Sequence, residues 1–74
     1  MEKRVVQIRS APVELYKILK FENIVSSGGE AKFVISEGLV RVNGNVEMRK
    51  RRKVLPGDTV QIGKTVMEIQ LSVD

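Results

Sequence analysis

The feature that most constrains this chain is a two-residue turn, Asn43-Gly44, set between two short stretches of alternating apolar and polar residues. Asn-Gly is typical of a tight β-hairpin, because both central residues of such a turn need positive φ angles. We therefore predict antiparallel strands over residues 39–42 and 46–48. The two valines of the first strand then share one face, and Arg41 lies on the other face with Asn43.

Five consecutive cations follow the predicted hairpin: Arg49, Lys50, Arg51, Arg52 and Lys53. A Pro-Gly-Asp turn at residues 56–58 closes this segment, so the cations lie between structured elements and not in a tail. If the segment is extended, alternate side chains point in opposite directions, with 49, 51 and 53 in one row and 50 and 52 in the other. Such a run is typical of a solvated loop, a targeting signal or a phosphate-binding patch, and its position favours the patch.

Composition removes most enzyme classes. The chain has 74 residues, a formal net charge of +4, and neither cysteine nor histidine. Disulfides, thiolate metal sites, Ser-His triads and the usual general base are therefore excluded. The carboxylates of Glu30, Glu37 and Glu47 have no evident base or metal partner, so we expect no catalytic residue, no metal and no cofactor. A basic chain of this kind favours a polyanionic partner.

The rest of the chain predicts one α+β domain over residues 1–74: two short helices packed on a small curled antiparallel sheet. The remaining expected elements are an edge strand at 4–9, helices at 13–22 and 29–37, and a last hairpin at 59–62 and 65–69. Ser10-Ala11-Pro12 supplies a start for the first helix. Ser26 or Ser27 caps the second helix, and Gly38 ends it.

The helix faces separate apolar from charged side chains. In the first helix Leu15, Ile18 and Leu19 fall on one face and Lys17 and Lys20 on the other, which by itself indicates only a solvated surface.

In the second helix Ala31, Val34 and Ile35 form the apolar stripe. Phe33 lies opposite that stripe and has two interpretations. It is either a platform for stacking a base or, as we favour, a side chain packed under a neighbouring segment such as the amino-terminal strand.

The pattern SxxEAxxxIxxGxVxVNG, followed by a basic segment ending in Pro-Gly-Asp, resembles the S-four RNA-binding domain, also called the αL motif. The resemblance covers residues 13–62 and is closest to the short free-standing bacterial members. It implies that the helices and the hairpin form an L-shaped surface that grips structured RNA, with the 49–53 run extending it. The RNA-contacting residues implied on the motif itself are Lys17, Lys20, Lys32, Arg41 and Asn43.

The chain departs from the family pattern at Gly28, Lys32 and Phe33, where arginines are common. The Gly28-Gly29 pair has two open interpretations, an anion site at the helix start and a flexible turn. A helix-turn-helix that reads duplex DNA is disfavoured, because the start of the second helix offers few base-reading side chains.

The expected function is therefore non-enzymatic binding of structured RNA, with ribosomal RNA as the expected target, in ribosome assembly or translation. The alternative is a protein-interaction adaptor that docks on a ribosome or on an acidic protein surface, using Phe33 with Tyr16 or Phe21. No signal peptide or membrane-spanning run is evident, so we expect a cytoplasmic protein with no membrane partner and no small-molecule substrate.

Overall fold

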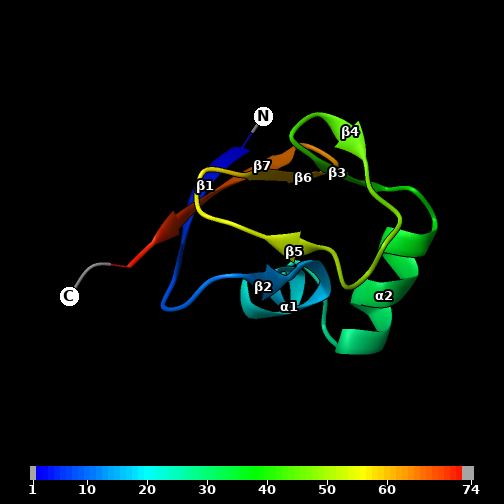
Figure 1. Cartoon of the computed structure of the whole chain (residues 1–74). Helices are drawn as coiled ribbons and strands as arrows, with labels where there is room; N and C mark the ends of the chain where they lie inside the picture. The colour runs from blue at the N-terminus through cyan, green and yellow to red at the C-terminus, as the bar shows by residue number, and fades with distance from the viewer. Residues whose placement is uncertain (1, 73–74) are drawn as a thin grey trace.

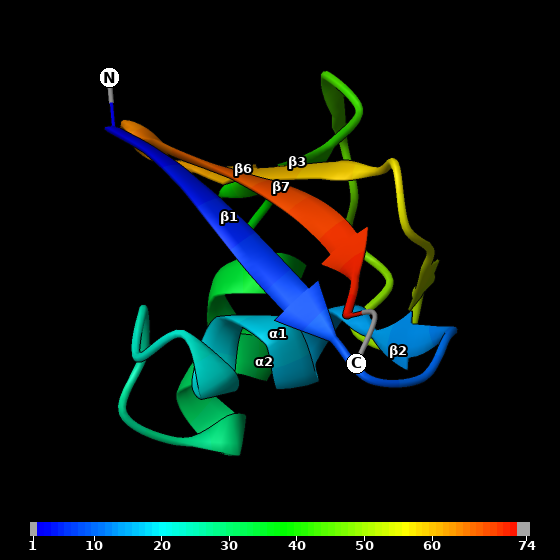
Figure 2. The ribbon, with the colours of Figure 1, turned by 90° about the vertical axis from the view of Figure 1, so that its left-hand side faces the viewer.

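The computed structural model describes residues 2–72. A sheet lies over two helices (Figure 1), and a long connection runs down one side of the molecule from the sheet to the helices (Figure 2). The helices are α1 (Leu15–Phe21) and α2 (Gly28–Ser36). The five-stranded sheet runs in the order β1 (Glu2–Ile8), β7 (Thr65–Leu71), β6 (Thr59–Ile62), β3 (Val40–Val42) and β4 (Asn45–Val46). A separate two-stranded pair joins β2 (Val13–Glu14) to β5 (Lys53–Val54). The predicted α+β class is confirmed.

The sheet is mixed, whereas the sequence predicted an antiparallel one. β1 runs parallel to β7, with Glu2 opposite Thr65 and Ile8 opposite Leu71. Figure 2 shows the two strands side by side. The predicted edge strand is confirmed, but its direction depends on a partner at the other end of the chain, which no local pattern reveals.

The predicted hairpin at Asn43-Gly44 is confirmed. Both turn residues have positive φ angles, 52° for Asn43 and 85° for Gly44, and Val42 lies opposite Asn45. Both valines of β3 are buried, and Arg41 between them is exposed, as the alternation predicts.

The predicted start of α1 is wrong. Val13 and Glu14 form β2, and the helix begins at Leu15 without a side-chain cap. Its first amides are satisfied from far along the chain: the N–H of Leu15 donates to the carbonyl of Arg52 (2.9 Å), and that of Tyr16 to the carbonyl of Lys50 (3.1 Å). A distant segment therefore does what Ser10 and Pro12 were expected to do.

The ends of α2 follow the prediction to within one residue. The Ser27 hydroxyl accepts from the N–H of Glu30 (3.1 Å), and the Glu30 carboxylate accepts from the N–H of Ser26 (2.7 Å). This reciprocal arrangement resembles a capping box. Gly38 has a φ of 76° and donates its N–H to the carbonyl of Ile35, which ends the helix.

The core lies between the helices and the inner face of the sheet. The predicted helix positions Leu15, Ile18 and Leu19 are fully buried, as are Ala31 and Ile35. Full burial of each larger aliphatic side chain stabilises the fold by about 1.5–3 kcal/mol. The sheet contributes Val6, Ile8, Val40, Val42, Val60, Met67 and Ile69. No helix in residues 2–72 is both long and apolar enough to cross a membrane.

Candidate nucleic-acid interface

The basic run is folded into a turn, so the predicted pair of extended rows is wrong. The N–H of Arg52 donates to the carbonyl of Arg49 (3.2 Å), with Lys50 and Arg51 at the tip of the turn. Only the end of the run is extended, where Lys53 pairs with Glu14. The bonds from α1 to the carbonyls of Lys50 and Arg52 fix the backbone of this turn against the helix start.

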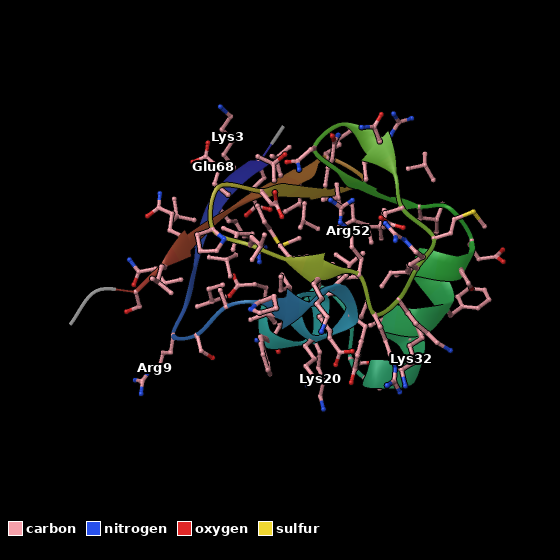
Figure 3. All side chains as sticks on the ribbon, viewed as in Figure 1. Lys3, Arg9, Lys20, Lys32, Arg52 and Glu68 are labelled. Atoms are coloured by element: carbon pink, nitrogen blue, oxygen red, sulfur yellow. The ribbon has the colours of Figure 1, made fainter. Side chains whose placement is uncertain are left out.

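A buried carboxylate holds two of the five cations. Glu47 is 7% exposed, and its carboxylate accepts from Nε and Nη2 of Arg49, both at 3.0 Å. It also accepts from the backbone N–H of Arg49 (3.1 Å) and from Nη1 of Arg52 (2.9 Å). Figure 3 shows Arg52 directed into the space between β5 and the β3–β4 hairpin. The side chains of Arg49 and Arg52 therefore converge on one point, although alternation would have separated Arg52 from Arg49.

Glu47 stays ionised in this environment. The hydrogen bonds from Arg49 dominate and, with that from Arg52, lower the pKa of Glu47 to about 2, although burial acts in the opposite direction. The same contact raises the pKa of Arg49 above its usual value. The carboxylate thus offsets part of the repulsion within the run.

The site predicted from the sequence did not include Glu47, although the register of the predicted hairpin could have revealed it. The tight turn sets the hairpin register, which places residue 47 opposite residue 40, and the N–H of Glu47 does donate to the carbonyl of Val40 (2.9 Å). Since Val40 faces the core, the register already indicated a partly inward carboxylate immediately before five cations.

Three cations of the run remain available to a ligand. Lys50, Arg51 and Lys53 are exposed, and none of the ion pairs found within residues 2–72 involves them. A surface hollow of about 490 Å³ is lined by Arg49, Arg51, Arg52 and Lys53. Guanidinium and ammonium groups around one hollow suit a phosphate backbone.

The lysines of the two helices meet around Tyr16. The Nζ atom of Lys32 lies 4.9 Å from the centre of the Tyr16 ring, and that of Lys17 lies 6.0 Å from it. Lys17 also pairs with Glu14 at 3.4 Å. Because the N–H of Tyr16 binds the carbonyl of Lys50, these lysines adjoin the basic turn. Lys20 extends outward from α1 (Figure 3).

The two hairpin residues of the predicted site differ in whether their side chains are available to a ligand. Arg41 is exposed, with one bond from Nη1 to the carbonyl of Gly44 (3.3 Å). The Asn43 amide instead joins two turns: Nδ2 donates to Asp58 (3.0 Å), and Oδ1 accepts from the N–H of Thr59 (2.9 Å). The bond from Asn43 lowers the pKa of Asp58. A contact between Asn43 and RNA stays a prediction, and its side chain already has a structural role.

Phe33 does not pack under a neighbouring segment, so the favoured prediction is wrong. Its side chain is 60% exposed on α2, and Phe21 on α1 is 64% exposed. Ala31 and Ile35 are the buried residues of this helix, and Phe33 lies on its exposed face. Within residues 2–72, no cluster of acidic side chains is placed to hold a metal ion.

Comparison with known proteins decides the family. Residues 6–70 match the family model described as the S4 domain. The chain belongs to the S4 domain family. It is 52% identical over 48 residues to YbcJ of Escherichia coli (strain K12), covering 65% of this chain and 69% of that protein. It is 37% identical over 57 residues to the "Probable ribosome maturation protein RlbA" of Bacillus subtilis (strain 168), covering 77% of this chain and 80% of that protein.

The fold of this S4 domain is also similar to a solved structure. The solution structure of YbcJ from E. coli superposes with a TM-score of 0.69 at 37% identity, covering 89% of this chain and 85% of YbcJ. That structure was described as revealing an αL motif involved in RNA binding. The resemblance noted from the sequence is therefore confirmed at the level of family and fold.

The departures of this S4 domain from the family pattern, at Gly28, Lys32 and Phe33, lie within the first two turns of α2. Gly28 and Gly29 form its first turn, so they are helical and not a flexible turn. A side chain added at Gly28 would meet no atom within 4 Å, which leaves that surface open. The charge that this end of α2 lacks is carried by the basic turn.

Proposed function

We propose that this chain is a non-enzymatic protein that binds structured RNA, and that its target is ribosomal RNA. The observation that carries the proposal is the fixed basic turn, whose free cations Lys50, Arg51 and Lys53 adjoin Lys17 and Lys32 of the helices. Membership of the S4 domain family and the description of YbcJ support RNA binding. The name of RlbA supports a ribosomal target and a role in ribosome assembly or translation.

Binding of this kind depends on shape and charge. The exposed cations contact phosphates, so affinity falls as salt rises, with a slope of about 0.7–0.9 per phosphate neutralised. Double-helical RNA hides its base edges in a deep and narrow major groove. The proposal therefore predicts preference for a folded RNA geometry over duplex DNA, without strong dependence on base identity.

A pair of matched double variants tests the proposal. Lys50→Gln with Arg51→Gln removes two cations at the tip of the basic turn, and Lys3→Gln with Arg9→Gln removes the same charges from the two ends of β1, away from that turn (Figure 3). Anisotropy titrations with fluorescently labelled ribosomal RNA at several salt concentrations measure both. We expect the first pair to lower the salt slope by about 1.4–1.8, in line with two lost phosphate contacts, and the second to lower it far less. Equal losses from both pairs, or equal affinity for duplex DNA, would contradict the proposal.

A second candidate is favoured by the exposed apolar side chains. Phe21, Phe33 and Met48 are each at least 60% exposed, and they offer an apolar surface to a protein of the ribosome or to an acidic protein. Nuclease treatment before affinity capture separates the two functions. An RNA-binding protein loses its ribosomal partners after the treatment, whereas an adaptor keeps them.

A further inference from the structure

We propose that Glu47 is a positioning residue for RNA: it holds Arg49 and Arg52 as a frame, so that Lys50 and Arg51 are presented to the phosphates. The inference rests on the proposed function and divides the run into two sets. Arg49 and Arg52 shape the turn, and the cations outside the ion pairs with Glu47 make the contacts.

The geometry of the frame supports this division. One carboxylate receives four hydrogen bonds from the two arginines, at 2.9–3.1 Å. Arg52 is held at three points: its guanidinium by Glu47, its N–H by the carbonyl of Arg49, and its carbonyl by the N–H of Leu15. The tip residues Lys50 and Arg51 have no side-chain bond of this kind among the hydrogen bonds of residues 2–72, and they face solvent.

Electrostatics alone would disfavour a carboxylate here. A negative charge about 6 Å from a phosphate weakens binding roughly threefold, even in water. The compensating effect is order: a loop already held in its bound shape loses less conformational entropy when RNA binds. Five adjacent cations repel one another, so we expect loss of the carboxylate to loosen the turn, which the backbone bonds from α1 would then hold alone.

The two effects predict opposite changes in RNA affinity for Glu47→Gln, a substitution that keeps the shape of the side chain and removes its charge. If Glu47 acted only as a charge, this variant would bind RNA about threefold more tightly. If it positions the turn, binding weakens about tenfold, comparable to the cost of immobilising one or two long side chains. Glu37→Gln is the matched control, because Glu37 is an exposed carboxylate at the end of α2 and its loss changes the net charge equally.

Arg52→Lys provides a second variant in which the net charge is constant. A lysine cannot reproduce the planar fork that reaches Glu47, so we expect weaker RNA binding here also. Binding is measured with labelled ribosomal RNA, at a temperature where circular dichroism shows every variant folded. A purely structural role would lower the unfolding temperature and leave the affinity of the folded protein unchanged. We expect the hydrogen bond to Glu47 to slow the exchange of the Arg52 guanidinium protons in the wild type, and their NMR signals to broaden or vanish in Glu47→Gln.

The outcomes separate the two proposals. If the wild type binds and Glu47→Gln and Arg52→Lys bind as well or better, the positioning role is overturned and the RNA-binding function stands. If the wild type itself does not bind ribosomal RNA above the level of the Lys50→Gln, Arg51→Gln variant, the proposed function fails and the positioning role with it. If Glu47→Gln does not fold, the RNA affinity of Arg52→Lys alone tests the positioning role.

Discussion

Replacing Glu47 by glutamine should make the unfolding free energy of this domain less dependent on pH in the acid range. The contacts from Arg49 and Arg52 lower the pKa of Glu47 from 4.5 to about 2. A difference of this size corresponds to at most about 3–4 kcal/mol of unfolding free energy. The side chain of Arg49 is 76% exposed, so solvent screens the strongest contact and we expect about 1.5 kcal/mol.

The pH window follows from the direction of the pKa change. Because the folded protein holds the carboxylate ionised, the stabilisation is fully present above pH 4.5 and is lost as the pH falls toward 2. Protonated Glu47 then resembles the glutamine of the variant. The difference between wild type and Glu47→Gln should therefore be about 1.5 kcal/mol at pH 7 and should approach zero near pH 2.

Urea unfolding of both proteins between pH 2 and pH 7 measures this difference directly. The pKa values of Glu2 and Asp58 are also lowered, but these groups are the same in both proteins and cancel in the comparison. A difference that stays constant from pH 7 to pH 2 would refute the reasoning, because it would show that the substitution acts through packing and not through charge.

Two other predictions concern the scaffold. Ser27→Ala removes the acceptor for the N–H of Glu30 and should lower the unfolding free energy by about 1 kcal/mol in urea titrations, whereas Ser27→Asp should retain it; equal losses from both variants would contradict the capping role. Asn43→Ala breaks the link between the hairpin turn and Asp58 and should cost about 1–3 kcal/mol of stability. If the role of Asn43 is structural alone, the RNA affinity of the folded Asn43→Ala protein stays within about twofold of wild type; a tenfold loss would instead support the RNA contact predicted from the sequence.

The local elements were predictable because their signals are local. Asn43-Gly44 predicts its hairpin through the φ angles it accepts, and Ser27 and Gly38 predict the ends of α2 through a cap and a left-handed residue. The buried stripe of α1 follows from helical spacing alone. These parts of the fold needed no knowledge of distant partners.

The parts that sequence reasoning got wrong depend on contacts between distant segments. α1 starts late because Val13 and Glu14 pair with β5, and because carbonyls of the basic run satisfy the first amides of the helix. β1 is parallel because it adds beside β7. The basic run is a turn because Glu47 and α1 hold it from two sides. Side chains alternate between two faces only in an extended strand, and contacts with Glu47 and α1 fold this segment into a turn.

Sequencing of RNA crosslinked to the tagged protein in cells tests the central claim most directly. The comparison is a variant in which Lys50, Arg51 and Lys53 are glutamine, which keeps the Glu47 frame intact. We predict that the wild type enriches one region of ribosomal RNA and that the variant loses this enrichment. Recovery of no more RNA by the wild type than by the variant would contradict the account.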